Sequence, residues 1–575
     1  MYLPGGVPSA HVDRFAARNL PPRELWPVMD YATVPELAAY PARLNAAVAL
    51  LDDSVAAGRG ARPCIHFNRR TLTYAALKDV ADRVARVLVE DYGLQPGNRV
   101  LLRAPNNAML VACWFAVLKA GGICVTTMPL LRARELTTLI DKAEIALALC
   151  DVRLAQELET ARARAPRLAR IGYFTATGEA GDPDADLDHR MAKKPAGFAN
   201  VATAADDVAL IAFTSGTTGA PKGTMHFHRD VLAVCDCFPR SILGARADDV
   251  VCGSPPLAFT FGLGALTLFP MRFGAAAVLL EQISPEILLE AIRDYRATAC
   301  YTAPTGYRAM TDLAGRYDIA SLRTCVSAGE HLPKPTAERW HQATGIKIID
   351  GIGATEMLHM FIAAAGDDVR FGATGRAIPG YQATIVDPEG RPVRDGEVGR
   401  LAVRGPTGCR YLADPERQKA YVQNGWNLTG DVYRRDADGY YWYQARADDM
   451  IISAGYNIAG PEIESVLLEH PKVKECAVVA APDAQRGHIA KAFVVLREAS
   501  DANPDTVRAL QDFVKAEIAP YKYPRAIEFI DTLPRTETGK LQRFRLREQE
   551  EARAAAMATA TGELEAPSSS SLRGA

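Results

Sequence analysis

The chain has 575 residues, of which 48% are hydrophobic and 23% charged, and its formal net charge is −2. This length exceeds one ordinary core and predicts at least two domains, and the composition is typical of a soluble globular protein. A net charge near zero gives no electrostatic reason to expect an anionic partner. We therefore expect a small-molecule partner, no nucleic acid and no membrane.

The eleven cysteines include no CxxC pair, and Cys235 and Cys237 form a CxC without a companion cluster. This pattern indicates neither a zinc site nor a disulfide framework, and reduced thiols in a cytoplasmic protein are the simplest interpretation. The N-terminal residues show no basic segment followed by an apolar one, so we expect no secretory signal. The longest apolar stretch, 257–280, contains Pro270 and Arg272, which favours buried core over a membrane span.

Apolar runs alternate with helical patterns along the first part of the chain, and this alternation predicts layers of parallel α/β structure. A helix is expected over 75–88, where apolar residues recur at helical spacing. The predicted strands are VLLRAP (100–105), ICVTTMP (123–129), IALALCD (145–151), VALIAFTS (208–215), AAAVLLE (275–281), TACYTAP (298–304), TCVSAG (324–329) and IKIIDGIG (346–353).

The texture changes at about Tyr381, where short runs with turn signals predict antiparallel sheet and a β-rich subdomain. After Arg446 a helix (461–470), a strand (473–480) and a helix (507–518) predict a second compact unit. The final residues are rich in alanine and serine. We expect a large N-terminal domain (1–445), a small mobile C-terminal domain (446–550) and a disordered tail (551–575).

The stretch 214–224, TSGTTGAPKGT, follows the apolar run 208–213 and combines loop chemistry with phosphate chemistry. Its glycines let backbone N–H groups approach an anion, and its hydroxyls and Lys222 can bind phosphate oxygens. Lys222 is followed by Gly223, and no glycine stands directly before it, which disfavours a Walker P-loop. A glycine-rich surface turn is the alternative. The candidate phosphate ligands are Thr214, Ser215, Gly216, Thr217, Thr218, Gly219 and Lys222.

This loop resembles the signature loop of the acyl-adenylate-forming (AMP-binding) superfamily, which includes acyl-CoA synthetases, luciferases and nonribosomal adenylation domains. Other elements similar to the family's motifs follow in the expected order: LTYAALKDVADRVA (72–85), LKAGG (118–122), GIGATE (351–356), TGD (429–431), ARADD (445–449) and PRTETGK (534–540). The resemblance implies an α/β fold. It consists of a large N-terminal adenylation domain of stacked parallel α/β layers with a β-rich subdomain, and a small α+β C-terminal domain on a hinge.

The resemblance also implies an ATP site. Thr355 would contact the α-phosphate and Glu356 would help to hold Mg²⁺, although Ile352 stands where relatives have an aromatic residue. Asp431 would bind the ribose hydroxyls beside Arg446, which follows Ala445 in place of a common glycine. The adenine would pack between two backbone edges formed by Ser327, Ala328, Gly329 and Glu330 on one side and by Asp350, Gly351 and Ile352 on the other.

By the same resemblance the reaction has two halves. A carboxylate attacks the α-phosphorus of ATP while Lys540 stabilises the charge that develops there. The C-terminal domain then rotates about a hinge at Asp448 and brings Gly455 and Tyr456 to a tunnel for coenzyme A. ATP, Mg²⁺ and coenzyme A are the implied cofactors. Lys540 lies in a P-x4-G-K pattern that resembles the site of bacterial acetyltransferases, so an acetyltransferase and a deacetylase are expected partners.

The acyl pocket is assigned from 255–270 and 350–361, which look like the benzoate–CoA ligase branch. Phe259 occupies the gating aromatic position. Thr260 stands where amino-acid-activating relatives have Asp, and it could face a ring amine; His359 is either a core residue or a donor to a ring substituent. Residues 10–27 resemble ligases of 2-aminobenzoate. The pocket residues are Phe259, Thr260, Phe261, Gly262, Ala303, Gly353 and His359, with Ala328, Gly329 and Ile352 as further walls.

The expected activity is therefore that of an aryl-CoA ligase in aromatic acid degradation, with 2-aminobenzoate favoured and benzoate or hydroxybenzoate next. A medium-chain fatty acyl-CoA synthetase, an inactive ATP- or acyl-binding protein, and an adenylating enzyme with another acceptor stay open as alternatives. A homodimer is also open. The presence of Lys540, Glu356 and Asp431 argues against the inactive form.

Overall fold

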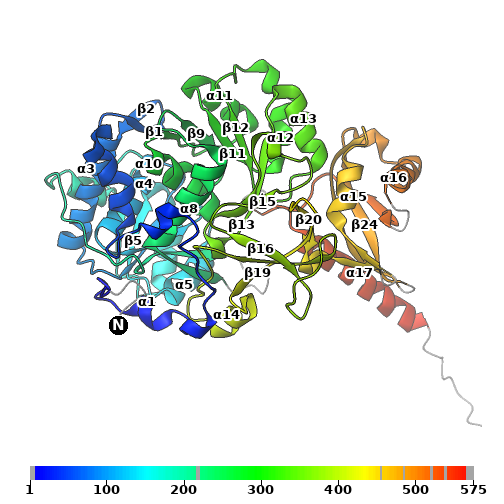
Figure 1. Ribbon diagram of the computed structural model, residues 1–575, viewed down its shortest axis with the longest axis horizontal. Coiled ribbons are helices and arrows are strands. Elements are labelled where there is room, and N and C mark those ends of the chain that lie inside the picture. The colour runs from blue at the N-terminus through cyan, green and yellow to red at the C-terminus, as the bar shows by residue number, and fades with distance from the viewer. Residues whose placement is uncertain are drawn as a thin grey trace, which may run out of the picture. The chain divides into compact units, whose positions relative to one another are not determined.

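The computed structural model describes residues 7–214, 221–453, 456–483, 486–518, 522–536 and 540–564 (Figure 1). The chain divides into two compact units. The first comprises 1–332, 336–429 and 434–442, and the second comprises 333–335, 430–433 and 443–575.

The first unit contains a six-stranded sheet with the strand order β6-β5-β3-β4-β7-β8. Five of its strands are parallel, and β8 returns antiparallel to β7 with Thr214 opposite Lys222. The predicted runs at 100–105, 123–129, 145–151 and 208–215 form four of these strands. The bounds are β3 (Arg99–Arg103), β4 (Ile123–Thr127), β5 (Leu147–Asp151), β6 (Arg170–Phe174), β7 (Val208–Thr214) and β8 (Lys222–Phe227).

A second sheet has nine strands in the order β15-β14-β13-β12-β11-β9-β10-β1-β2. Its middle strands are parallel, and antiparallel strands close both edges. The other four predicted runs form β10 to β13, so the parallel α/β prediction is confirmed. The bounds are β1 (Pro63–Phe67), β2 (Arg70–Thr73), β9 (Val250–Gly253), β10 (Ala276–Val278), β11 (Ala299–Thr302), β12 (Thr324–Ser327), β13 (Ile348–Gly353), β14 (Met360–Ala363) and β15 (Arg376–Ala377).

Helices flank these strands, and the helix predicted at 75–88 is α3, where the Thr73 side chain accepts a hydrogen bond from the first turn. Helix α4 packs against α3, and all twelve of its residues are buried, which explains why its sequence is apolar on every face. The bounds are α1 (Phe15–Asn19), α2 (Pro35–Ala38), α3 (Tyr74–Arg86), α4 (Ala108–Lys119), α5 (Ala133–Lys142), α6 (Ala155–Arg164), α7 (Asp186–Met191), α8 (His228–Phe238), α9 (Thr260–Leu263), α10 (Phe269–Phe273), α11 (Pro285–Tyr295), α12 (Pro304–Thr311), α13 (Lys334–Thr344) and α14 (Pro415–Tyr421).

The apolar stretch 257–280 is buried core, as predicted; its members Leu266 and Met271 are fully buried. Within the described residues, none of the helices combines the length and the apolar character that a membrane span requires.

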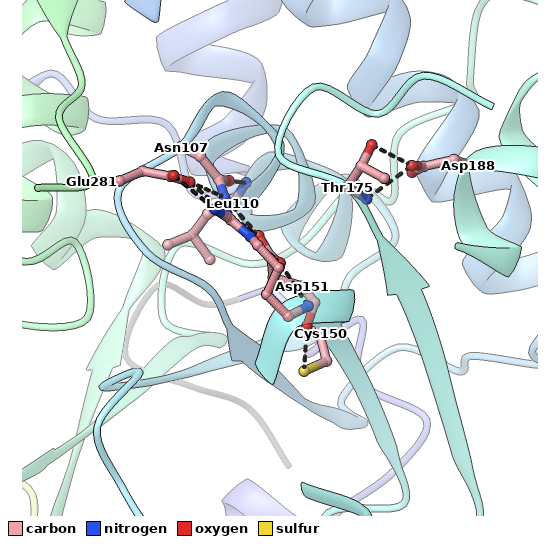
Figure 2. Close-up of polar contacts among 8 residues, drawn as sticks. Asn107, Leu110, Cys150, Asp151, Thr175, Asp188 and Glu281 are labelled. Atoms are coloured by element: carbon pink, nitrogen blue, oxygen red, sulfur yellow. Dashed lines mark hydrogen bonds and ion pairs between the residues drawn. The ribbon is translucent and has the colours of Figure 1, made fainter. Parts of the chain in front are cut away.

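A polar cluster joins the six-stranded and the nine-stranded sheet (Figure 2). Asn107 caps α4 by accepting from the Leu110 N–H, and its amide nitrogen donates to Asp151 at 3.1 Å and to Glu281 at 3.2 Å. Asp151 ends β5 and Glu281 follows β10, so one asparagine contacts both sheets. Beside it, Asp188 accepts two hydrogen bonds from Thr175. These hydrogen bonds are internal to the fold, and we interpret the cluster as structural.

The antiparallel texture predicted from about Tyr381 is confirmed by a five-stranded sheet in which β16 pairs antiparallel with β17. Three of the boundaries between the two units fall within its strands β19 and β20, and the other two flank the segment 333–335. The bounds are β16 (Gln382–Val386), β17 (Val398–Arg404), β18 (Val422–Gln423), β19 (Trp426–Arg435) and β20 (Tyr441–Arg446).

The second unit has its own core, built on the long hairpin of β23 and β24 with α15 and α16. Its helices and its long strand match the predicted elements at 461–470, 473–480 and 507–518. Residues 551–564, placed in a disordered tail by the sequence, continue helix α17, because alanine favours a helix where it follows one. Residues 565–575 lie outside the described residues. The bounds are β21 (Ile451–Ser453), β22 (Tyr456–Ile458), α15 (Gly460–Leu467), β23 (Val473–Asp483), β24 (Gly487–Leu496), α16 (Pro504–Glu517), β25 (Ala526–Phe529) and α17 (Arg543–Leu564).

Candidate active site

The glycine-rich loop joins β7 to β8, and its two ends are held together by the hairpin that pairs Thr214 with Lys222. Lys142, at the end of α5, donates to the Pro221 carbonyl at 2.7 Å and fixes the exit of the loop. Gly223 is required by packing, since a Cβ there would lie 2.9 Å from the Phe213 ring. Five predicted phosphate ligands lie outside the described residues: Ser215, Gly216, Thr217, Thr218 and Gly219.

The other edge of β8 pairs with the segment 410–412. The Met225 N–H donates to the Arg410 carbonyl and the Leu412 N–H donates to the Gly223 carbonyl, both at 2.8 Å. Arg410 is fully buried, and its guanidinium is paired with the Asp230 carboxylate at 2.7 Å. This charge pair anchors the segment against β8.

The GIGATE motif ends β13 and turns into a short helix at Thr355–Met357, close to β8. The ring of His226, on β8, bonds through Nε2 to the Thr355 carbonyl at 2.7 Å. Burial lowers the pKa of His226 to about 4, so the ring is neutral and its Nε2–H donates to that carbonyl. Glu356 Oε1 accepts a hydrogen bond from the Tyr411 hydroxyl at 2.6 Å. The GIGATE motif therefore meets β8, the strand that follows the predicted phosphate loop, through His226, and it meets the neighbouring segment 410–412 through Tyr411.

The two segments assigned to adenine follow neighbouring parallel strands, with Ser327 on β12 beside Asp350 on β13. Gly329 is exposed with φ at +90°, a conformation that favours glycine. Ser327, Ala328, Asp350 and Gly351 are buried, whereas Glu330 and Ile352 are half-buried. The carboxyl group of Asp350 has its pKa raised to about 8 by burial, against hydrogen bonds from Thr374 and the Gly351 backbone.

In the second unit, Asp431 and Arg446 form an ion pair at 2.8 Å. The Asp431 side chain is 12% exposed and that of Arg446 is 50% exposed, so the guanidinium remains accessible to solvent. Gly430 lies beside them with φ at +77°, and a Cβ there would lie 3.2 Å from the guanidinium. The pairing brings together the two residues that the sequence assigns to one sugar.

Lys540 is exposed and belongs to the second unit. Its N–H donates to the Thr536 hydroxyl at 3.0 Å, and its carbonyl accepts from the Thr536 N–H at 2.7 Å. The predicted hinge residue Asp448 belongs to the short helix Ala447–Asp449, and Tyr456 begins β22; only their backbones are described. Gly455 lies outside the described residues.

The acyl-pocket candidates gather around α9, which begins at Thr260 with Phe259 as its cap. Both side chains are half-buried, as are Phe261 and Ala303. The Phe261 ring lies 6.0 Å from Tyr301 and 5.9 Å from His359, measured between ring centroids. Close packing explains the two glycines: a Cβ at Gly262 would lie 2.1 Å from the Pro256 carbonyl oxygen, and one at Gly353 would lie 2.8 Å from the His359 backbone.

His359 is buried among aromatic rings. Its ring centroid lies 4.5 Å from Phe269 in an edge-on arrangement and 5.7 Å from Phe238. Neither ring nitrogen makes a hydrogen bond of normal geometry to the described part of the chain. Burial lowers the pKa of His359 to about 3, and the nearby Phe261 carbonyl opposes this only in part. The ring is therefore neutral, and it offers one donor and one acceptor.

Four contact residues escaped the sequence analysis: Lys142, His226, Tyr301 and Tyr411. None of them belongs to a motif, and each reaches the site through pairing of strands or helices that are distant in the sequence. Tyr301 alone carried a signal, because it lies in the predicted strand 298–304 just before Ala303.

Known proteins resemble this chain in sequence and in fold. The sequence pattern of the AMP-binding enzyme family matches residues 52–411, and that of the AMP-binding enzyme C-terminal domain matches 462–540. A benzoate–CoA ligase of Thauera aromatica is 34% identical over 90% of this chain and 99% of its own. A 4-hydroxybenzoate–CoA/benzoate–CoA ligase of Rhodopseudomonas palustris is 35% identical over 88% of this chain and 94% of its own.

Among solved structures, an anthranilate CoA ligase in complex with anthranoyl-AMP superposes with a TM-score of 0.85 at 33% identity. The match covers 90% of this chain and 99% of that one. Family, fold and near full-length coverage agree. The chain therefore belongs to the AMP-binding, acyl-adenylate-forming enzyme family, in its benzoate–CoA ligase branch, and is an AMP-forming acid–thiol ligase that uses ATP and coenzyme A.

Proposed function

We propose that the protein converts a small aromatic carboxylate to its CoA thioester, with 2-aminobenzoate favoured and benzoate or hydroxybenzoate next. This proposal rests on near full-length relatives that are named as CoA ligases of benzoate, hydroxybenzoate and anthranilate. Anthranilate is 2-aminobenzoate. Such a ligase serves the degradation of aromatic acids in the cytoplasm.

The aromatic cluster around α9 supports a flat substrate. Phe261 is half-buried and backed by Tyr301 and His359, so its ring can lie against another ring. Thr260 carries a hydroxyl at the adjacent position, where a ring amine could bond to it. His359, neutral and without a normal hydrogen bond to the described chain, is a second candidate for that amine.

In the first half-reaction the carboxylate attacks the α-phosphorus of ATP, which gives the acyl-adenylate and releases pyrophosphate. The loop 214–222 and Thr355 bind and orient the phosphates, and Asp431 with Arg446 holds the ribose. The adenine lies between 327–330 and 350–352. Lys540 approaches the α-phosphate as negative charge develops there, a preorganised charge of the kind that stabilises transition states.

Mg²⁺ fits the residues present at the loop. Nucleotide-bound Mg²⁺ takes one or two protein carboxylates together with phosphate oxygens and water. Glu356 supplies a half-buried carboxylate on the turn that meets the base of the loop. When bound there, the ion would neutralise charge on the phosphates.

In the second half-reaction the thiol of coenzyme A attacks the acyl carbonyl and AMP leaves. Rotation of the C-terminal domain about Asp448 would withdraw Lys540 and bring Gly455 and Tyr456 to the thiol's path. Glycine suits such a path because a Cβ would narrow it.

The test is a panel of acids assayed for pyrophosphate release and, by mass, for the acyl-CoA product. We expect the highest kcat/KM for 2-aminobenzoate, then benzoate and hydroxybenzoates, with hexanoate lower by about 100-fold, in the range that pocket fit can supply. A hexanoate preference would instead support a medium-chain fatty acyl-CoA synthetase. ATP binding without turnover of any acid would support an inactive binding protein, and pyrophosphate without an acyl-CoA would indicate another acceptor.

A further inference from the structure

Tyr411 contacts the carboxylate of the GIGATE motif from a segment that no motif covers. Its hydroxyl donates to Glu356 Oε1 at 2.6 Å, a short hydrogen bond to an acidic group. The Tyr411 residue is 2% exposed, and its ring packs edge-on against Tyr421 with centroids 5.7 Å apart. The hydroxyl is therefore held in place by packing on the rest of the side chain.

The backbone of Tyr411 is fixed as firmly as its ring. It pairs with Thr224 on β8, two residues after Lys222, and its N–H donates to the Gln418 side chain at 2.9 Å. Gln418 is fully buried, and its amide donates at 3.0 Å to the carbonyls of Leu25 and Cys409. Tyr411 thus spans two elements of the site: the strand that leaves the phosphate loop and the carboxylate of Glu356.

The phenol hydroxyl is the donor in this hydrogen bond, so one oxygen of Glu356 is engaged as its acceptor. The plane of the carboxylate, and with it the direction of the second oxygen, is set by the tyrosine.

We propose that Tyr411 is a positioning residue that orients Glu356 toward nucleotide-bound Mg²⁺ and ties that orientation to the phosphate loop. This inference rests on the proposed role of Glu356 as a carboxylate for Mg²⁺. Tyr411 itself touches no substrate and acts through Glu356.

The experiment compares ATP binding in the presence of MgCl₂ with ATP binding in EDTA, by calorimetry on the full chain. Tyr411→Phe keeps the ring and removes only the hydroxyl. We expect it to weaken the binding of ATP with Mg²⁺ by about 10- to 100-fold, the loss that is typical when a residue hydrogen-bonded to a metal ligand is removed. The affinity for metal-free ATP should change by no more than about twofold. Tyr421→Phe, a matched loss of a phenol hydroxyl on the neighbouring ring, should change neither. Thermal unfolding of each variant shows whether it is folded.

Glu356→Gln distinguishes the proposed role of Tyr411 from the proposed role of Glu356. If it weakens ATP binding only when Mg²⁺ is present and Tyr411→Phe does not, the positioning role is wrong and the site assignment stands. If Glu356→Gln has no effect that depends on Mg²⁺, the assignment of Glu356 fails and this inference fails with it. Equal weakening by Tyr411→Phe with and without Mg²⁺ would also overturn the inference, because it would show that the tyrosine only supports the fold of the loop.

Discussion

Asp350 places a buried titratable group within one of the proposed adenine segments. Its pKa is raised to about 8 by burial, and no charged neighbour contributes to the shift. The folded protein therefore binds one more proton here than the unfolded chain between about pH 4 and pH 8. The free energy of unfolding should fall as the pH rises through this window, because the charged carboxylate is poorly solvated in the fold.

Asp350→Asn tests this directly, since the amide cannot ionise. At pH 5 the variant and the wild type should have similar free energies of unfolding. At pH 9 the variant should be more stable than the wild type by about 1 kcal/mol or more, as measured by denaturant unfolding at both pH values. A difference in unfolding free energy that stays the same at both pH values would show that Asp350 does not titrate in this range.

His359 is open to two interpretations, a core residue or a contact of the substrate, and its environment allows a test. It packs against Phe238, Phe261 and Phe269, so an apolar residue of similar volume can replace it. In His359→Leu we expect kcat/KM for 2-aminobenzoate to fall about tenfold and that for benzoate to change little, because only the former has an amine to bond. Equal losses for both acids would assign His359 to the core.

At the scale of elements, the position of α9 depends on Gly262. A Cβ at this residue would lie 2.1 Å from the Pro256 carbonyl oxygen, and a backbone atom can be displaced only at a substantial energetic cost. Gly262→Ala should shift α9 and with it Phe259 and Thr260. We expect a stability loss of about 1–3 kcal/mol and a larger relative loss of kcat/KM for the aromatic acid than of ATP affinity.

Gly315→Ala is the matched control, since a Cβ there would meet nothing within 4 Å. It should leave both the unfolding midpoint and the kinetic constants unchanged. If Gly262→Ala behaves like this control, the backbone around α9 is more adaptable than its contacts indicate.

The strands of the two large sheets are the part of the fold that the sequence predicts well. The strands that carry the site were predicted because each is a continuous apolar run buried between layers, and period and length identify such runs. Residues on the motifs, such as Thr355 and Glu356, are assigned to the site by resemblance. Tyr411 and Lys142 are not, because strand register and helix packing bring them to the loop and neither leaves a local signal.

At the scale of the whole molecule, the chain has two units with separate cores, and the predicted catalytic residues are divided between them. Lys222, Thr355 and Glu356 belong to the first unit, and Asp431, Arg446 and Lys540 belong to the second. A reaction that needs both sets requires the units to come together, and a second step that needs a different face requires them to move. The sequence predicts that Arg446 and Lys540 belong to the second domain, but its boundary at 445/446 places Asp431 in the first, whereas the structure places Asp431 in the second unit.

Lys540 gives the sharpest test of that division. The side chain of Lys540 is exposed, so Lys540→Gln should remove the charge and leave the unfolding midpoint unchanged. We expect pyrophosphate formation to fall by about 100-fold or more, because a charge placed where the transition state becomes negative is lost. Thioester formation from supplied benzoyl-adenylate should fall far less, because Lys540 would be turned away in that step. Equal losses in both half-reactions would contradict alternation.

Acetylation of Lys540 removes the same charge and should reproduce the kinetic loss of Lys540→Gln. If Lys540 stays unmodified and activity stays full after acetyltransferase treatment, that regulation is ruled out.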